Sequence, residues 1–157
     1  MYTPIQGDLH AGQFRFAIVA SRFNDMITRR LIDGAIDCLE RHGATEQQYA
    51  VYLCPGAFEL PLVAARVAAA GGVDAIICIG VVIKGETPHN EYIASEVTKG
   101  IAQVSLQERI PVAFGVLTTN TLEQALERAG LKHGNKGWEA ALSSLEMVNL
   151  LANIPAQ

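Results

Sequence analysis

The most constraining feature of the sequence is the alternation of short, continuous apolar runs with segments of helical periodicity. The four runs cover residues 14–20, 48–54, 75–81 and 111–117. Their hydrophobicity is continuous, which is typical of strands covered on both faces in a parallel sheet. Because strict alternation of strands and helices implies βαβ crossovers, the pattern predicts an α/β fold: a three-layer α/β/α sandwich with a mostly parallel four-stranded sheet, flavodoxin-like in character.

The segments between these runs have the apolar spacing of helices. Two stripes run through residues 27–39 and 93–104, a helix-like segment covers residues 58–70, and a last helix runs through residues 138–148. Thr121 to Gln124 ("TLEQ") has the pattern of a capping box at the start of a further short helix. With 157 residues and no linker or repeat, we expect a single domain over residues 1–157.

Charge and cysteine content exclude several classes of protein. The net charge is −4, and no cluster of Lys or Arg offers a surface for nucleic acid or an anionic membrane. The three cysteines are far apart in apolar stretches, so neither a disulfide framework nor a Cys-x-x-Cys motif is indicated. The most apolar stretch, residues 73–83, is too short to span a membrane, and the amino terminus lacks the pattern of a signal peptide. We therefore expect a cytoplasmic protein.

Unusual residues follow each predicted strand, where ligands bind in open parallel sheets: "SRFN", "PGAFELP", "KGETPHNEY" and "TTNT". In the third loop, Gly85, Glu86 and Thr87 precede a helix whose first-turn amides and positive dipole end can hold an anion. Equally compatible with the spacing is a structural role, in which Gly85 and Pro88 shape a turn and Thr87 caps the helix.

Three further side chains in these loops are candidates for binding or catalysis. His89 lies beside the candidate anion site, and an imidazole with an ordinary pKa of about 6.5 can transfer protons near neutral pH. Phe23, in an otherwise polar loop, either stacks on a planar heterocycle or anchors the loop. Glu59 either accepts hydrogen bonds from a polyhydroxylated ligand or stabilises a helix N-terminus.

The sequence also lacks the common cofactor motifs. No GxGxxG opens the first helix, no Walker motif occurs, and no group of His, Cys or carboxylate residues has the spacing of metal ligands. We expect no metal and no nucleotide cofactor.

Four motifs in this order, "SRFN", "PGAFELP", "GVVIKGETPH" and "FGVLTTNTLEQALERAG…KHGNKGWEAA", resemble the lumazine synthase family along nearly the whole chain. The resemblance implies condensation of 5-amino-6-(D-ribitylamino)uracil with 3,4-dihydroxy-2-butanone 4-phosphate to 6,7-dimethyl-8-(D-ribityl)lumazine, phosphate and water, in the penultimate step of riboflavin biosynthesis and without a cofactor. A non-catalytic lumazine or riboflavin carrier would keep Phe23 and Glu59 but could dispense with Arg128 and His89. A flavodoxin-like electron carrier is suggested by fold class alone, which is a poor basis for function.

The resemblance implies a role for each matching position. The residues that would bind the pyrimidine and its ribityl chain are Phe23, Ala57, Phe58, Glu59, Val81, Val82, Ile83 and Phe114. Those that would hold the ketone phosphate are Glu86, Thr87, Arg128 and Lys136. Phe23 would stack on the ring, and the planar guanidinium of Arg128 suits phosphate oxygens. His89 would transfer protons during imine formation, phosphate elimination and ring closure.

The resemblance also implies self-association. Family sites lie between neighbouring subunits, with Phe114 and Arg128 facing the Phe23 and His89 loops of a neighbour, so we expect an obligate pentamer. The compact "KHGNKGWEAA" turn resembles members whose pentamers close into an icosahedral shell, which makes riboflavin synthase a candidate cargo. One departure is Asn90, since an aromatic residue commonly follows the histidine; this leaves the packing beside His89 open.

Overall fold

The computed structural model of the chain describes residues 1–85, 87–131 and 134–156. Its centre is an all-parallel sheet in the order β2-β1-β3-β4. The strands are β1 (Phe16–Ser21), β2 (Tyr49–Cys54), β3 (Ala75–Ile83) and β4 (Val112–Thr119). The four predicted strands and their parallel arrangement are therefore confirmed. β3 and β4 extend two residues beyond the predicted ends because Val82 pairs with Thr118 and Ile83 with Thr119.

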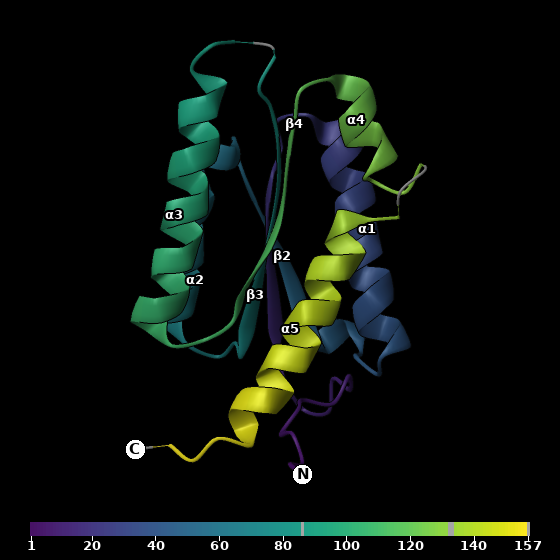
Figure 1. The fold of residues 1–157 in the computed structure, drawn as a ribbon, viewed down its shortest axis with the longest axis vertical. Coiled ribbons are helices and arrows are strands. Elements are labelled where there is room, and N and C mark those ends of the chain that lie inside the picture. Colours follow the sequence, from purple (N-terminus) through teal and green to yellow (C-terminus); the bar gives the residue numbers. More distant parts are fainter. Residues whose placement is uncertain (86, 132–133, 157) are drawn as a thin grey trace.

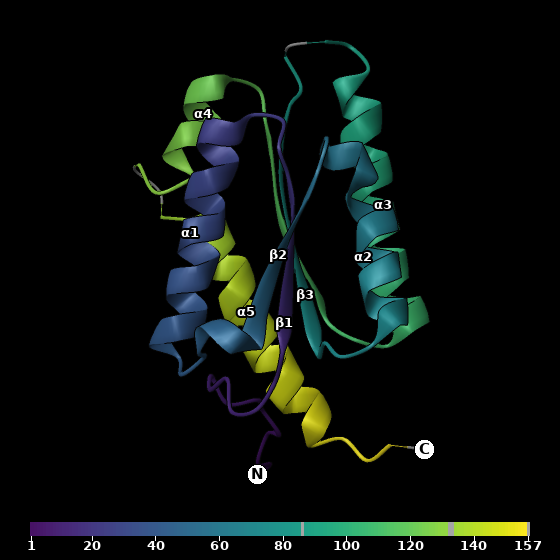
Figure 2. The ribbon, with the colours of Figure 1, turned by 180° about the vertical axis from the view of Figure 1, so that it is seen from behind.

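Helices cover both faces of the sheet, as predicted. They are α1 (Asp25–Arg41), α2 (Leu60–Ala70), α3 (Asn90–Glu108), α4 (Leu122–Glu127) and α5 (Lys136–Ala152), with short 3₁₀ turns η1 (Glu46–Gln48) and η2 (Ala57–Glu59). Figure 1 and the reverse view in Figure 2 show α2 and α3 on one face and α1, α4 and α5 on the other. The loops that follow the strands lie at the upper end of Figure 1, and both termini lie at the lower end.

The core is divided by the sheet into two apolar clusters, because successive side chains of a strand point to opposite faces. Ile18 and Ile77 pack with the α1 and α5 side, whereas Val19 and Ile76 pack with α2 and α3. Helices α1 and α5 approach closely at Gly137, where a Cβ atom would collide with the backbone carbonyl of Leu31. A glycine at this position lets α5 lie directly against α1.

Strand β2 differs from the expectation that every strand is covered on both faces. Val51, Tyr52 and Leu53 are 40%, 44% and 56% exposed. The reason is position: β2 pairs only with β1 and forms an edge of the sheet that the helices of the same chain leave open. The prediction of full coverage is wrong for this strand, and its apolar side chains are free to contact another molecule.

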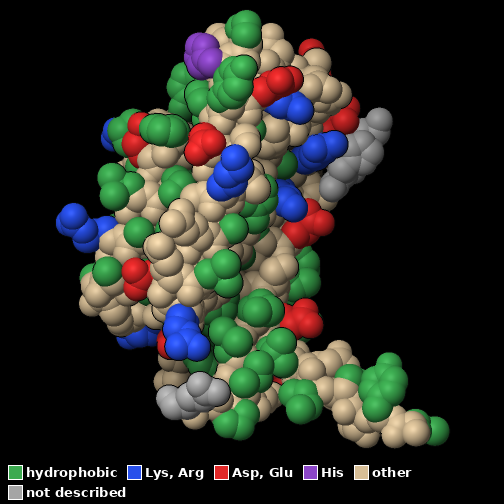
Figure 3. Space-filling model, turned by 60° about the vertical axis from the view of Figure 1, so that its left-hand side comes forward, with side chains coloured by type: hydrophobic (Ala, Val, Ile, Leu, Met, Phe, Trp, Pro, Cys, Tyr) green, Lys and Arg blue, Asp and Glu red, His purple; other side chains and the backbone are tan. Residues whose placement is uncertain are grey.

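The amino-terminal arm is a second exposed apolar region. Met1, Tyr2, Ile5 and Leu9 all expose much of their surface. The arm projects from the lower right of the space-filling view in Figure 3, where hydrophobic side chains are green. Among the described residues, no helix is long and apolar enough to cross a membrane.

The three cysteines are buried and unpaired, as predicted for reduced core residues. Burial raises the pKa of the Cys38 thiol to about 11 and that of the Cys78 thiol to about 12. Burial also raises the pKa of Cys54. These thiols are therefore held in the protonated form near neutral pH.

Candidate active site

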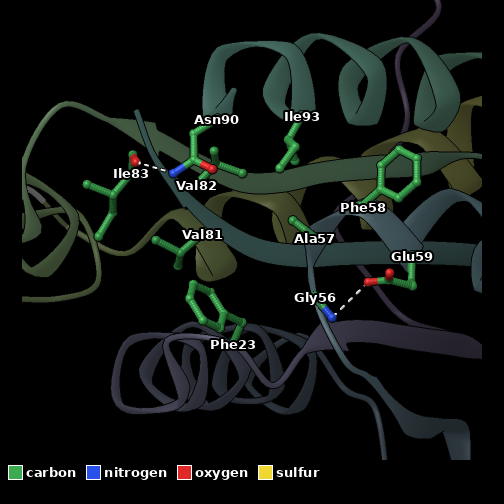
Figure 4. A pocket seen from close by; sticks show the side chains of 10 residues that line it. All are labelled: Phe23, Gly56, Ala57, Phe58, Glu59, Val81, Val82, Ile83, Asn90 and Ile93. Carbon is green, nitrogen blue, oxygen red and sulfur yellow. Dashed lines mark hydrogen bonds between the residues drawn. The ribbon is translucent and has the colours of Figure 1, made fainter. Parts of the chain in front are cut away.

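A cavity of about 150 Å³ lies at the carboxyl ends of β1, β2 and β3. Figure 4 shows its lining residues: Phe23, Gly56, Ala57, Phe58, Glu59, Val81, Val82, Ile83, Asn90 and Ile93. All the predicted residues for the pyrimidine substrate except Phe114 are among them. This group comes from three separate loops and strand ends, which parallel pairing brings to one edge of the sheet.

Phe23 reaches the cavity from the loop after β1. The amide of Arg22 donates a hydrogen bond to the carbonyl oxygen of Cys54 (2.8 Å), and that of Phe23 to Pro55 (3.1 Å), so this loop is fixed to the loop after β2. The next residue, Asn24, has φ = 62° and lies directly before α1. Phe23 itself is 62% exposed, so it is not a core residue. An aromatic face held at the mouth of a cavity can stack on a planar ring.

Glu59 closes the 3₁₀ turn η2 and makes no side-chain capping bond to α2, so its structural role differs from the helix N-terminal role that the sequence left open. Its Oε2 accepts a 2.9 Å hydrogen bond from the backbone amide of Gly56, which holds the turn before α2. An ionised carboxylate has about four acceptor positions on its two oxygens. The bond to Gly56 therefore leaves Glu59 able to accept further hydrogen bonds at the cavity (Figure 4).

Asn90 and Ile93 line the cavity although the sequence analysis did not assign either to the site. Both belong to the first turn of α3, three residues apart and therefore on one helix face. The signal for Ile93 was present, because it begins the apolar stripe of that helix. Asn90 was noted in the sequence only because an aromatic residue commonly follows the histidine at this position.

The loop between β3 and α3 carries the candidate anion site. Thr87 Oγ1 and His89 Nε2 lie 3.4 Å apart, and His89 is exposed. His89, not Thr87, is the residue before the first turn of α3, and it makes no side-chain capping bond, so the alternative in which Thr87 caps the helix is wrong. Glu86 lies outside the described residues. The amides at the start of α3 and the positive dipole end remain suited to an anion.

A second cavity, of about 440 Å³, contains the remaining predicted residues Phe114, Arg128 and Lys136. It is also lined by Val116, Leu117, Thr118 and Glu139. Arg128 directly follows α4. This helix begins with the predicted capping box, in which the amide of Gln124 donates to Thr121 Oγ1 at 3.2 Å. Within one chain, Arg128 and Lys136 therefore lie in a different hollow from Phe23 and Glu59.

Neither hollow resembles a metal site. In the described part of the chain, no three His, Cys, Asp or Glu side chains are grouped so that they could hold a metal ion. The polar groups of the first cavity are an amide and a carboxylate, and the charged groups of the second are two cations and one carboxylate. Such groups suit hydrogen bonding to an organic ligand and charge pairing with an anion.

Comparison with known proteins agrees with this arrangement. The family model described as 6,7-dimethyl-8-ribityllumazine synthase matches residues 13–152. The protein of that name from Chlorobium limicola is 62% identical over 146 residues, which cover 93% of this chain and 94% of its own. The one from Pelodictyon phaeoclathratiforme is 58% identical over 150 residues, covering 96% and 97%. Since the match includes both cavities, the chain belongs to the 6,7-dimethyl-8-ribityllumazine synthase family.

Proposed function

We propose that the chain is a transferase of riboflavin biosynthesis that condenses 5-amino-6-(D-ribitylamino)uracil with 3,4-dihydroxy-2-butanone 4-phosphate. The observation that carries the proposal is the cavity of Figure 4, in which Phe23, Glu59 and the end of β3 come together in a chain 62% identical to a 6,7-dimethyl-8-ribityllumazine synthase. An exposed aromatic face, apolar strand residues and a partly free carboxylate suit a flat ring with a polyhydroxylated chain.

For the pyrimidine substrate, the ring would stack on Phe23 and contact Val81, Val82 and Ile83. Ala57, Phe58 and Glu59 would bind the ring edge and the ribityl chain, with the free acceptor positions of Glu59 taking hydroxyl protons. Phe114 would close the ring pocket from a neighbouring chain. Holding two reactants in one geometry would supply most of the rate enhancement.

For the ketone, Thr87, Glu86 and the start of α3 would hold the phosphate together with Arg128 and Lys136. The amine of the pyrimidine adds to the ketone carbonyl and water leaves as the imine forms. Cleavage of the C–O bond releases phosphate, and the second amine closes the ring with loss of water. His89 would give and take the protons of these steps.

The proposed site is shared between chains. The cavity of about 150 Å³ is smaller than the roughly 300–1,000 Å³ typical of small-molecule sites, so one chain provides only part of the pocket. The cationic hollow with Arg128 and Lys136 lies elsewhere on the chain, and β2 exposes apolar side chains. We infer that a neighbouring copy adds its Arg128 hollow to this cavity, in an obligate pentamer.

The connection between α4 and α5 supports the proposal of a larger assembly. The antiparallel bridge of Ala129 with Asn135 closes this connection, and the amide of Lys136 donates to the Arg128 carbonyl at 3.0 Å. A turn this compact supports the closing of pentamers into an icosahedral shell, with riboflavin synthase as its candidate cargo. Three protonated, unpaired thiols support a cytoplasmic location.

The direct test mixes the purified protein with both substrates, without metal or nucleotide, and follows lumazine fluorescence together with phosphate release. Equal amounts of lumazine and phosphate, formed faster than in the uncatalysed reaction, are expected. Tight binding of lumazine or riboflavin without turnover would instead indicate a carrier. Light scattering at neutral pH tests the shell, since a lone pentamer under several buffers would contradict it.

A further inference from the structure

The side chain of Asn90 connects the first turn of α3 to the end of β3. Its Nδ2 donates a 2.7 Å hydrogen bond to the carbonyl oxygen of Ile83, drawn as a dashed line in Figure 4. A carbonyl oxygen can only accept, so the amide group has one orientation that makes this bond. The bond joins the two ends of the loop of residues 84–89.

The start of this loop, at Lys84 and Gly85, is also fixed by contacts with β4 and the residue after it. The amide of Lys84 donates to the Thr119 carbonyl at 2.7 Å, which ties the start of the loop to β4. Gly85 passes so close to Asn120 that a Cβ would lie 2.5 Å from the Asn120 carbonyl oxygen. These contacts hold the beginning of the loop, whereas His89 is at its end, next to Asn90.

Few contacts hold the imidazole of His89 itself. The ring is exposed, and the Thr87 hydroxyl at 3.4 Å is at the long limit for a hydrogen bond. The surrounding structure therefore fixes the point at which the His89 side chain is attached, and this point depends on the backbone of residues 89 and 90. Misplacing a reacting group by about 1 Å can cost on the order of a hundredfold in rate.

We propose that Asn90 is a positioning residue for His89, an inference that rests on the proposed role of His89 in proton transfer. By holding the first turn of α3 against Ile83, Asn90 fixes the distance between the imidazole and a substrate bound over β3. We expect its contribution in the chemical step, because the Ile83 carbonyl oxygen already engages the Asn90 Nδ2 group.

The competing role is that of a simple cavity wall, and Ile93 provides the comparison. Ile93 lines the same cavity from the first turn of α3, three residues after Asn90. Its side chain is apolar and cannot donate to Ile83. A wall residue affects the affinity for the pyrimidine, whereas a positioning residue affects turnover.

The test compares Asn90→Leu, which has a similar size but no donor, with Ile93→Val. Each change is made alone and together with His89→Ala, and kcat and KM are measured for both substrates with size and thermal unfolding as controls. We expect Asn90→Leu to lower kcat about tenfold alone and less than about twofold in the His89→Ala background, because acting through one group makes effects non-additive. Ile93→Val should alter mainly KM for the pyrimidine.

An equal loss of kcat from Asn90→Leu in both backgrounds, or a change confined to KM, would overturn the positioning role. Slow turnover in His89→Ala together with normal turnover in Asn90→Leu would overturn this inference and leave the role of His89 intact. Normal turnover in His89→Ala would overturn both the role of His89 in proton transfer and the positioning role of Asn90. If Asn90→Leu does not fold, Asn90→Ala gives the same comparison, because it removes the donor without adding a charge.

Discussion

The backbone amide of Lys136 donates a 3.0 Å hydrogen bond to the carbonyl oxygen of Arg128, so the last turn of α4 and the first turn of α5 meet at these two cations. Both side chains line the second cavity, which has Glu139 as its carboxylate. Two positive charges against one negative charge favour an anionic ligand. This contact places Arg128 and Lys136 in one cavity despite the seven residues between them.

Arg128→Ala should weaken use of the phosphorylated ketone far more than binding of the pyrimidine. Loss of a charge-assisted hydrogen bond costs about 1.5–3 kcal/mol, which corresponds to an increase in KM for the ketone of roughly 10- to 150-fold. Steady-state kinetics with each substrate varied in turn measures the effect. Arg66→Ala, on the exposed side of α2, is the matched control. Equal increases in both KM values would contradict the phosphate contact.

His89→Ala should lower turnover by about a hundredfold, the lower end of the usual contribution of general acid–base catalysis, and leave substrate binding largely unchanged. The reaction should continue slowly because binding still orients the reactants. Single-turnover fluorescence separates chemistry from binding. His10→Ala removes another exposed histidine, which lies outside both cavities, and should leave turnover unchanged. Wild-type turnover in His89→Ala would exclude the residue from the mechanism.

Mixed assemblies test whether the site is shared. Chains carrying His89→Ala still have Arg128, and chains carrying Arg128→Ala still have His89, so a site between chains is intact wherever the two variants meet in the right order. Equal amounts of the two variants are unfolded and refolded together. If association is random, about one neighbouring pair in four has both residues intact, so the mixture should regain about a quarter of the wild-type activity. Refolding each variant alone is the control. A mixture no more active than its parts would place each site within one chain.

Glu59 should show two separable effects. Glu59→Ala removes the acceptor of the Gly56 amide and should lower the free energy of unfolding by about 1 kcal/mol, as for loss of a helix cap. Glu59→Gln keeps an acceptor for Gly56 but loses the charge. We expect Glu59→Gln to unfold like wild type and to bind the pyrimidine more weakly, as seen by thermal unfolding and calorimetry. Normal binding by the Gln variant would leave Glu59 with a structural role alone.

The cysteines should be unreactive in the folded protein. Burial raises the pKa of Cys38 to about 11 and of Cys78 to about 12, so at pH 8 almost no thiolate is present. Because each pKa is higher in the folded chain than its ordinary value of 9.0, this contribution to stability is complete below pH 9 and is lost as the pH rises further. A thiol reagent at pH 8 should label the native protein slowly. In urea, the same reagent should label three thiols per chain. Rapid labelling of the native protein would contradict this.

Much of the fold could be predicted because the apolar pattern reports burial directly. β1 and β3 are buried at every position, and their sequences are continuous apolar runs. The same reasoning failed for β2, since Val51 and Leu53 look equally apolar whether another helix or another molecule covers them. The ends of β3 and β4 were misplaced because pairing of Ile83 with Thr119 depends on register, which local composition does not encode.

Most residues that line the two cavities were predicted from the sequence, but their separation into two cavities was not. The loops that follow the strands were expected at one edge of the sheet, which brings Phe23 and Glu59 together, whereas the resemblance alone indicated Val81. The placement of Arg128 depends on how α4 packs against β3 and β4 and on the bond between the Lys136 amide and the Arg128 carbonyl, and neither follows from local composition. Asn90 was visible only as an unusual neighbour of His89. The bond from Asn90 to Ile83 closes a loop, and the periodic pattern of apolar residues does not predict a bond of this kind.

Strand β2 also bears on how the protein is made in quantity. A newly synthesised chain that has folded but not met its neighbours presents an open strand edge with Val51, Tyr52 and Leu53 uncovered, and such an edge pairs with any extended segment that it encounters. If the proposed pentamer buries this strand, productive association and aggregation compete for the same surface. Substitutions that slow the meeting of chains should therefore reduce the yield of soluble protein on expression, even when every molecule that does assemble is fully active.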